Sequence, residues 1–345
     1  MPSMKNRAHN LSRYVATLVA SAIFLTAFAF APSRAVAERI KVGVVKLPNA
    51  TYIALEKGYF AAEGLEVELV FFDVATPIAV GIVSGDLDFG ATGLSAGFYS
   101  LAGQGALKII SGGSSIAPTF NDFAYVASNR AYAAGLKSVK DFPGHSVAIS
   151  QFGTPVHYCL ALLAEKYGLD LKSMRILPLQ SNPNQVSALI GGSADAAVIP
   201  ATYVLPAIQR GEVKLLGWVG DETPWQNGAV ITATKTVNQR SDTVERFLRA
   251  YRKAVRDYHD AFAGEDEKRK DGPTAPAIYA ILAKYTGQPA ELIKLGIQYI
   301  DYDARLDVKD VLHQIAWYKS QGMLKEQVNG AELIDKRYVI ALPER

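Results

Sequence analysis

The heptapeptide IVSGDLD (residues 82–88) returns in similar form as LIGGSAD (residues 189–195). Each copy falls where a predicted helix ends at a glycine and a short strand follows, and Gly85 and Gly192 stand 107 positions apart. Glycines also end many unrelated helices, so the pattern around the two copies has to decide between duplication and coincidence. If that pattern repeats as well, the chain contains two lobes built on one plan.

Strands and helices alternate around both copies. In the first half, the expected strands are 40–46, 65–72, 88–92 and 107–111, and the expected helices are 51–62, 76–84 and 96–102. In the second half, the expected strands are 146–150, 174–179, 196–199 and 213–219, and the expected helices are 155–167, 184–191 and 203–209. This alternation is typical of right-handed βαβ units. We therefore predict an α/β fold of two lobes, each a mostly parallel sheet flanked by helices.

Beyond residue 240 the pattern becomes purely helical. Apolar residues recur every three or four positions from Val244 to Phe262, which predicts one long amphipathic helix. Asp242 and Glu245 have the spacing of a capping box at its start. Further helices are expected near 274–285, 290–295 and 307–321. We expect this helical tail to fold back onto the first lobe.

The polar face of the long helix is basic. It carries five cations, which are Arg246, Arg249, Arg252, Lys253 and Arg256. Such a face can bind an anionic partner, but a row of charges on an amphipathic helix more often faces solvent. We favour the solvated face.

The composition of the 345 residues narrows the functional classes. With 49% hydrophobic and 20% charged residues, the chain has a globular composition, which excludes a fibrous or largely disordered protein. Its single cysteine, Cys159, excludes an intramolecular disulfide framework. The sequence contains no nucleotide-binding glycine motif and no metal-ligand spacing, so we expect no cofactor and no metal.

The first 37 residues have the pattern of an export signal. They contain four cations and no acid, an apolar stretch from residue 15 to 30, and the small residues Ala35 and Ala37 before a cleavage point. A membrane anchor is the alternative, but the apolar stretch is shorter than the roughly 20 residues of a typical span. We predict a signal peptide cleaved after Ala37 and a periplasmic protein.

Removal of this leader changes the charge balance. The formal net charge of +3 becomes −1, because the leader holds four of the 36 basic residues and none of the 33 acidic residues. Nucleic-acid binding rests on a basic surface that neutralises phosphates. A near-neutral body therefore argues against nucleic acid as a partner.

The turns that lead from strands into helices are the expected binding region, because pockets of parallel sheets form at the carboxyl ends of the strands. Seven such turns, in both halves, offer threonine, serine, asparagine or glycine, and almost none offers a charge. Free N–H groups at helix starts can hold an anion without an arginine. The same residue types are also the preferred helix N-caps. Seven turns that face one crevice favour a shared ligand site.

One turn also has the form of a catalytic motif. GLSAG (residues 93–97) matches G-x-S-x-G between a strand and a helix, which is the setting of a nucleophile elbow. A serine hydrolase also needs a histidine on a loop after a strand. His157, His259 and His313 fall within predicted helices, and His145 precedes a strand. We therefore predict that the protein is not an enzyme, with an exported serine hydrolase as the alternative.

Four segments resemble one known family. ALEKGYFAAEGLEV (residues 54–67), GDLDFG (85–90), SVKDFPGHSVA (138–148) and GTPVHY (153–158) are similar to segments of the nitrate/sulfonate/taurine substrate-binding proteins of ABC importers, the NMT1/THI5-like family. The resemblance spans roughly residues 40–232. It implies a type II periplasmic-binding-protein fold, a small solute held between the lobes, and delivery of that solute by a monomer to an inner-membrane ABC permease.

The resemblance also implies how the chain is divided. The expected signal peptide, first part of lobe 1, lobe 2 and return to lobe 1 are residues 1–37, 38–126, 127–228 and 229–345. The hinge strands would be 123–128 and 229–234. A receptor that passes its ligand state to a membrane sensor would have the same organisation. Pyrimidine-forming enzymes also share this fold, but they need iron-binding histidines, which the turns of this chain lack apart from His157.

By position, the resemblance implies eleven ligand-binding residues. From the first lobe they are Asn49, Thr76, Thr92, Gly93 and Ser114, and from the second lobe Phe152, Gly153, Thr154, His157, Thr202 and Trp218. Sulfonate-binding relatives often have Trp-Asp-Pro-Tyr where this chain has IPATY (residues 199–203), which indicates a more apolar pocket wall. The expected ligand is a small organic anion or an aromatic or heterocyclic solute, such as a sulfonate, nitrate, an aromatic carboxylate or a pyrimidine-like ring.

Overall fold

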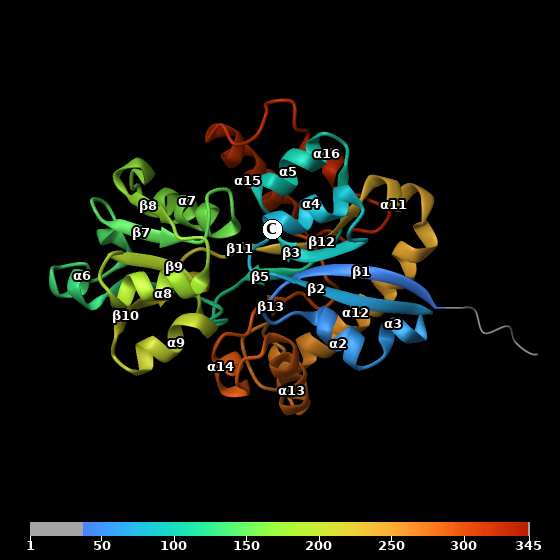
Figure 1. Ribbon diagram of the computed structural model, residues 1–345, viewed down its shortest axis with the longest axis horizontal. Coiled ribbons are helices and arrows are strands. Elements are labelled where there is room, and N and C mark those ends of the chain that lie inside the picture. The colour runs from blue at the N-terminus through green and yellow to red at the C-terminus, as the bar shows by residue number, and fades with distance from the viewer. Residues whose placement is uncertain (1–36, 344–345) are drawn as a thin grey trace, which may run out of the picture. The chain divides into compact units, whose positions relative to one another are not determined.

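The computed structural model describes residues 37–343 of the chain (Figure 1). The signal peptide predicted for residues 1–37 therefore lies, except for Ala37, outside the described residues. Two five-stranded sheets and one three-stranded sheet form the framework of the described part. Helices flank both five-stranded sheets, as Figure 1 shows.

The first sheet has the strand order β2-β1-β3-β12-β4. Its strands are β1 (Glu38–Val45), β2 (Leu65–Phe72), β3 (Phe89–Gly93), β4 (Leu107–Gly112) and β12 (Gly228–Ala233). β1 runs parallel to β2 and β3, whereas β12 is antiparallel to β3 and β4. One strand of this sheet therefore arrives from far along the chain.

The second sheet repeats this arrangement. Its strands are β6 (Phe123–Ser128), β7 (Ser146–Ile149), β8 (Arg175–Pro178), β9 (Ala196–Pro200) and β10 (Val213–Trp218). Written from the β8 edge, the order is β8-β7-β9-β6-β10. β7 is parallel to β8 and β9, and β6 is antiparallel to β9 and β10. The predicted two-lobed α/β fold is thus confirmed, and each lobe receives one antiparallel strand at the equivalent place.

A small sheet lies where the chain crosses between the lobes. β5 (Ser114–Ile116) pairs with β11 (Trp225–Gln226) and with β13 (Tyr299–Ile300), in both cases antiparallel. The chain leaves the first sheet through β5 and returns to it through β11. The boundary expected after residue 126 falls inside β6, a strand of the second sheet, and residue 229 is the second residue of β12.

Short helices connect these strands. The first lobe contains α2 (Ala50–Glu56), α3 (Tyr59–Ala62), α4 (Thr76–Ser84) and α5 (Ala96–Gly103). The second contains α6 (Asn129–Ala133), α7 (Pro155–Tyr167), α8 (Asn182–Ile190), α9 (Ala201–Gln209) and α10 (Val219–Glu222), with single 3₁₀ turns at Val139–Asp141 and Leu171–Ser173. The tail contains α11 (Thr234–Gln239), α12 (Ser241–Phe262), α13 (Ala275–Thr286), α14 (Ala290–Leu295), α15 (Val308–Ser320) and α16 (Gly330–Leu333). The elements β2, α4, α7 and α14 have the predicted bounds.

The continuous helix predicted for residues 51–62 is wrong. Two helices, α2 and α3, take its place and are separated by Lys57 and Gly58. Gly58 has a left-handed φ of 71°, which glycine adopts without steric cost. Periodicity alone did not reveal this break, because a single glycine inside a helical pattern is often tolerated.

The start of α12 also differs from the prediction. The helix begins at Ser241, and its N-cap residue, Arg240, makes no side-chain cap hydrogen bond. Asp242 therefore lies in the first turn, where its Oδ2 accepts a hydrogen bond from Arg246 Nε at 2.7 Å. The predicted capping box of Asp242 and Glu245 is wrong.

Three of the five cations on the basic face of α12, Arg246, Arg249 and Arg256, pair with acids of the same lobe. Arg249 pairs with Glu63 at 2.8 Å, and Arg256 pairs with Asp303 at 2.9 Å. About half of each arginine side chain, 53% and 52%, remains exposed. These contacts agree with a solvated helix face.

The helical tail folds against the first lobe, as expected, where α12 packs on α2 and α3. It also reaches the second lobe, because α15 contacts α7 and α14 contacts α9. The tail therefore contributes to both sides of the junction between the lobes.

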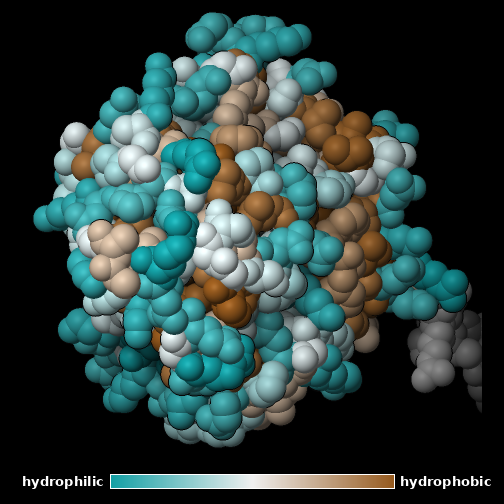
Figure 2. Space-filling view, turned by 60° about the vertical axis from the view of Figure 1, so that its left-hand side comes forward, coloured by the Kyte–Doolittle hydropathy of each residue, from teal (hydrophilic) through white to brown (hydrophobic). Residues whose placement is uncertain are grey.

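The central strands are almost completely buried. All six residues of β6 and all five of β9 are buried. Burial of every residue is typical of strands covered by helices on both faces. On the surface, hydrophobic residues form separate patches between hydrophilic ones (Figure 2).

The last aspartate of each heptapeptide has the same structural role. Asp88 Oδ2 accepts the backbone N–H of Lys41 at 2.8 Å, and Asp195 Oδ2 accepts the backbone N–H of Ser146 at 2.9 Å. The two N–H groups have equivalent positions. Lys41 directly precedes the first residue of β1 that pairs with β3, and Ser146 directly precedes the first residue of β7 that pairs with β9. The two carboxylates therefore hold equivalent points of the two sheets.

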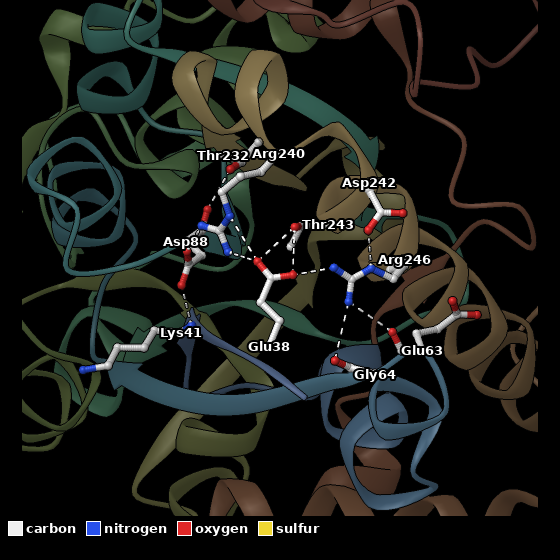
Figure 3. Close-up of polar contacts among 10 residues, drawn as sticks. All are labelled: Glu38, Lys41, Glu63, Gly64, Asp88, Thr232, Arg240, Asp242, Thr243 and Arg246. Carbon is white, nitrogen blue, oxygen red and sulfur yellow. Dashed lines mark hydrogen bonds and ion pairs between the residues drawn. The ribbon is translucent and has the colours of Figure 1, made fainter. Parts of the chain in front are cut away.

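An arginine completes each arrangement. Asp88 pairs with Arg240 at 2.5 Å, and Asp195 pairs with Arg130 at 2.9 Å. Arg240 follows the helix after β12, and Arg130 lies in the helix after β6, so each arginine comes from the segment behind the antiparallel strand. Figure 3 shows Asp88 between Lys41 and Arg240. These matched contacts favour duplication over coincidence as the origin of the heptapeptides.

Glu38 extends the first of these networks (Figure 3). Its carboxylate accepts hydrogen bonds from Arg240 Nη2 at 2.6 Å and Thr243 Oγ1 at 3.0 Å, and it pairs with Arg246. Burial alone would raise the pKa of Glu38, but the hydrogen bonds from Arg240, Arg246 and Thr243 bring this pKa below its ordinary value. The first residue of β1 is therefore an ionised anchor for α12.

Candidate functional site

A cavity of about 110 Å³ lies between the lobes. Residues at and after the carboxyl ends of β1 and β3 line it from the first lobe, and the starts of α7 and α8 line it from the second. A buried water needs about 10–15 Å³ by this measure, so the cavity has room for roughly seven to eleven waters. A small solute that replaces those waters would contact both lobes.

Five of the eleven predicted residues line this cavity, namely Asn49, Thr92, Gly93, Ser114 and Thr154. Thr92 is only 8% exposed, and its hydroxyl has no hydrogen-bond partner among the described residues. Ser114 Oγ accepts a hydrogen bond from Asn227 Nδ2 at 3.3 Å. The five come from both lobes.

The other six predicted residues lie outside the cavity lining, namely Thr76, Phe152, Gly153, His157, Thr202 and Trp218. Thr76 begins α4 and packs against Gly97, where a Cβ atom would lie 2.8 Å from Thr76 Cγ2. Its turn contributes Asp73 and two neighbouring residues to the cavity instead. Trp218 ends β10 and packs, half-buried, on the apolar cluster of the second lobe.

Phe152 and His157 face a separate outer groove, which they share with Trp317. The imidazole of His157 packs edge-on against both aromatic rings, at centroid distances of 5.1 and 4.9 Å. Its Nδ1 accepts the backbone N–H of Gly153 at 3.3 Å. Burial lowers the pKa of His157 to about 4, so this histidine is a neutral packing residue at neutral pH.

Gly153 and Thr202 lie at contacts between the lobes. Gly153 adopts a left-handed φ of 72°, and its carbonyl accepts the N–H of Ala96 at 2.8 Å. Thr202 packs against Gly296, where a Cβ atom would lie 2.8 Å from Thr202 Cγ2. Both residues therefore hold the lobes together at places beside the cavity.

A third contact joins α7 to α15. The hydroxyl of Tyr158 donates to Asp310 Oδ1 at 2.9 Å and lies 2.6 Å from His313 Nδ1. Burial raises the pKa of Asp310 above its ordinary range. The hydroxyl of Tyr318, also in α15, donates to the carbonyl of Thr154 at 3.0 Å.

Sequence reasoning missed several polar residues of the cavity. Tyr251, Gln298, Asn227 and Gln185 are each at most 7% exposed and line it. Tyr251 belongs to the apolar stripe of α12, which predicts a core residue, and Gln298 lies in the tail after α14. Neither stands in a turn between a strand and the following helix, so the pattern used for the other candidates did not include them.

The cavity lining is nearly uncharged. Among the described residues that line it, Asp73 is the only side chain with a formal charge at neutral pH, and it is exposed. The lining of the described cavity includes no lysine, arginine or histidine. The described lining therefore offers no cationic side chain that could attract an anion.

Two helix starts at the cavity are capped by side chains. Asn49 Oδ1 accepts the N–H of Thr51 at 2.9 Å at the start of α2, and Ser181 Oγ accepts the N–H of Asn184 at 3.3 Å at the start of α8. A side-chain cap uses a backbone donor that would otherwise be free. At these turns the N-cap interpretation is correct.

Ser95 of the G-x-S-x-G motif is also an N-cap. Its Oγ accepts the N–H of Phe98 at 3.2 Å, and the residue is completely buried. Among the described residues, no histidine is within hydrogen-bond distance of this hydroxyl. The geometry of a nucleophile elbow is therefore absent at this turn.

Other chemical features of the described residues are sparse. Cys159 is buried, and its burial raises the pKa of the thiol to about 12. Residues 37–343 contain no group of three or more histidine, cysteine or acidic side chains placed to hold a metal ion. None of the helices in this part of the chain is both long and apolar enough to cross a bilayer.

Residues 49–261 match the family described as NMT1/THI5 like. The chain belongs to this family. The resemblance inferred from the four sequence segments is thus confirmed. The family match covers the second sheet, every strand of the first sheet except β1, and most of α12.

Two curated relatives match over part of their length. A putative aliphatic sulfonates-binding protein of Bacillus subtilis is 28% identical over 225 residues, which are 63% of this chain and 64% of the relative. A putative binding protein of Brucella abortus is 29% identical over 189 residues, which are 53% of this chain and 54% of the relative. The chain therefore spans between half and two thirds of the length of these relatives.

Solved structures match over nearly their whole length. The alkanesulfonate-binding protein SsuA from Xanthomonas axonopodis pv. citri, bound to MOPS, is 18% identical, with a TM-score of 0.68 and coverage of 86% of this chain and 98% of that chain. A Candida albicans protein described as having the generic periplasmic binding protein structural fold is 14% identical, with a TM-score of 0.67 and coverage of 89% and 98%. The desulfurization enzyme DSZB is 12% identical, with a TM-score of 0.62 and coverage of 87% and 97%. These likenesses establish the fold.

Proposed function

We propose that this protein is an extracytoplasmic solute-binding protein of an ABC importer, which holds a small solute between its lobes and delivers it to an inner-membrane permease. The main observation in support of this proposal is the cavity, whose walls come from both lobes. A solute that contacts both walls favours the conformation in which the lobes are in contact, by the difference in its affinity for the two conformations. The resemblance to sulfonate-binding proteins supports the same role.

The proposed ligand is a small organic anion or an aromatic or heterocyclic solute. Apolar side chains such as Phe123 and Ile300 would contact its body, and Thr92, Ser114 and Thr154 would contact its polar groups. Thr92 carries the strongest case among these, because its buried hydroxyl lacks a partner within the described residues. A buried polar group is usually hydrogen-bonded, so a solute would complete this site.

The movement that we propose would separate the two lobes. The contacts beside the cavity, such as the hydrogen bond from Ala96 to the carbonyl of Gly153, would break on opening and form on closing. The crossovers before β6 and before β12 would act as the hinges. In this proposal the exported protein is a monomer, and the solute leaves when the permease stabilises the open form.

An exported enzyme is the second candidate function, because a desulfurization enzyme has the same fold. The serine hydrolase form of this alternative has little support, since Ser95 caps α5 and lacks a histidine partner in the described structure. Ester hydrolysis that disappears in Ser95→Ala would favour the enzyme. Retention of any such activity in Ser95→Ala would remove this serine from consideration.

Native mass spectrometry of the purified protein, followed by thermal shift with any co-purified solute, tests the proposed function. Binding to the folded state alone would raise its stability by about 2.7 kcal/mol at a hundredfold excess over Kd. Thr92→Val combined with Thr154→Val should reduce the shift to less than half, whereas the matched control Thr76→Val, outside the cavity, should retain it. Equal shifts in all three proteins would place the binding site elsewhere.

A further inference from the structure

Three buried polar side chains of the first lobe face the cavity without a partner. Thr92, Tyr251 and Gln298 are 8%, 2% and 6% exposed, and all three line the cavity. Within residues 37–343, the Thr92 hydroxyl is a buried atom without a hydrogen-bond partner. The Tyr251 hydroxyl and the Gln298 side-chain amide also make no hydrogen bond to a described residue, and both residues line the cavity. Buried polar groups in proteins are almost always paired. The three groups therefore indicate where a polar part of a ligand belongs.

The surroundings of these groups hold them in place. The ring of Tyr251 stacks on Phe247, with 6.2 Å between the ring centroids and 10° between the planes. The hydroxyl of Tyr258 donates to the backbone carbonyl of Gln298 at 3.0 Å, which fixes the backbone and leaves the side-chain amide uncommitted. Burial raises the pKa of Tyr251, and no charged group contributes to this shift. This end of the cavity is thus polar and carries no charged side chain.

An anion would find little compensation in the cavity. The described lining has no cationic side chain, and its one formal charge, Asp73, is negative. An ion removed from water needs a counter-charge or several strong hydrogen bonds. The remaining source of positive potential is the set of helix starts that face the cavity.

Part of these helix starts is occupied, although the start of α4, which also lines the cavity, has no side-chain cap. Besides the side-chain caps of α2 and α8, the start of α7 has Pro155 at its first position, which has no N–H. The N–H of His157 donates to the carbonyl of Thr154 at 3.0 Å, and the hydroxyl of Thr154 donates to the carbonyl of Gln151 at 2.7 Å. Few donors therefore remain at α7 to surround an anionic group.

From these contacts, and resting on the proposed function, we infer that the cavity selects an uncharged solute with an amide-like polar edge, such as a carboxamide, lactam or cyclic urea, and that Tyr251 and Gln298 read this edge. A glutamine amide and a tyrosine hydroxyl each both donate and accept hydrogen bonds. An amide edge offers one acceptor and one donor and so matches this pair. A sulfonate or carboxylate offers acceptors only and adds a charge.

Isosteric probes test this inference. We would measure the affinities of the mature chain for benzamide, benzoate and benzenesulfonate, and for uracil as a cyclic amide, by isothermal titration calorimetry. We expect benzamide or uracil to bind at least tenfold more tightly than both anions. Tighter or equal binding of either anion, or no saturable binding of either amide, would overturn the inference.

The outcomes also separate this inference from the proposed function. Binding of benzenesulfonate accompanied by a decrease in the radius of gyration would preserve a two-lobed solute receptor while overturning the neutral ligand class. Binding of an amide without any change in the radius of gyration would support the ligand class and count against the proposed closure of the lobes.

Two single-atom or near-isosteric variants locate the recognition. Tyr251→Phe removes only an unpartnered oxygen, and Gln298→Leu removes the amide, so each should retain the fold and weaken amide binding about tenfold. Tyr99→Phe is the matched control, because its buried hydroxyl donates to Gln314 Oε1 at 2.9 Å and lies outside the cavity lining. The control should lower the melting temperature and leave the affinity unchanged. Unchanged affinity in both Tyr251→Phe and Gln298→Leu would overturn the assignment.

Discussion

The two lobes share one construction but contribute differently to the cavity. Asp88 and Asp195 accept backbone N–H groups at equivalent points of the two sheets and pair with equivalent arginines. At the cavity, however, the first lobe presents Thr92, whose buried hydroxyl lacks a partner among the described residues. The second lobe presents α8, whose start is capped by Ser181, and α7, which begins at Pro155. The shared construction therefore accounts for the sheets, whereas residues that differ between the lobes, together with the helical tail, form the site.

The largest expected effect tests the shared construction. Asp195→Ala should lower the free energy of unfolding by about 3 kcal/mol, because it leaves the buried N–H and hydroxyl of Ser146 without their acceptor and removes the ion pair with the largely exposed Arg130. Asp88→Ala should also destabilise, by about 2 kcal/mol, since it accepts one backbone N–H and one arginine. Urea unfolding measures both values.

The neighbouring Asp86→Ala is the control for this comparison, because Asp86 is exposed and accepts a hydrogen bond only from Ser84 within the described structure. Its free energy of unfolding should change by no more than about 0.5 kcal/mol. A neutral effect of either Asp88→Ala or Asp195→Ala would contradict the equivalence of the two lobes.

The next effect concerns the outer groove. Burial lowers the pKa of His157 from 6.5 to about 4, so between these values the unfolded chain binds more protons than the folded one. Stability should therefore fall as the pH falls from 6.5 towards 4, with a loss of about 2 kcal/mol at pH 5 from this group.

His157→Leu should flatten that part of the stability–pH curve and leave solute affinity unchanged, since His157 lies outside the cavity. Denaturant unfolding at pH 5 and pH 8 compares the two proteins. A lost affinity in His157→Leu would mean that the outer groove, and not the cavity, holds the solute.

A smaller effect contrasts the polar groups of the two lobes. Thr92→Val should weaken solute binding about tenfold and leave stability nearly unchanged, because its hydroxyl lacks a partner in the described structure. Thr154→Val should cost about 1 kcal/mol of stability, because it loses the hydrogen bond to Gln151, and should weaken binding less. Calorimetry and thermal unfolding separate these quantities, and the reverse ranking would contradict the assignment of the polar end to the first lobe.

The smallest effect is electrostatic. Asp73→Asn removes the one formal charge among the described lining residues, at an exposed position, and should raise the affinity for an anionic probe about twofold without changing that for a neutral one. Titrations at low and high salt measure this difference. An equal change for both probes would show that Asp73 acts through shape and not through charge.

The alternation of strands and helices made most of the fold predictable. Central strands such as β9 appear in sequence as short apolar runs, and helices such as α7 end at a glycine, so their bounds follow from local patterns. The break at Gly58 depends on one left-handed residue and was missed. Local periodicity carries little information about such a single dihedral angle.

The site was predictable only where a turn after a strand supplies it. Asn49, Thr92 and Ser114 belong to such turns or strand ends and line the cavity. Tyr251 and Gln298 reach the cavity from the tail, more than a hundred residues away from those turns, and their sequence context resembles core and loop. Whether the backbone N–H donors at a helix start remain free for a ligand likewise depends on tertiary contacts, which no local sequence pattern reveals.

Small-angle X-ray scattering tests the central claim most directly. The mature protein would be stripped of bound solute by unfolding and refolding, and then titrated with the solute identified by native mass spectrometry. Our account predicts a decrease in the radius of gyration that saturates together with binding, because the solute draws both lobes onto itself. A scattering profile that stays constant while the solute binds would contradict a site formed between moving lobes.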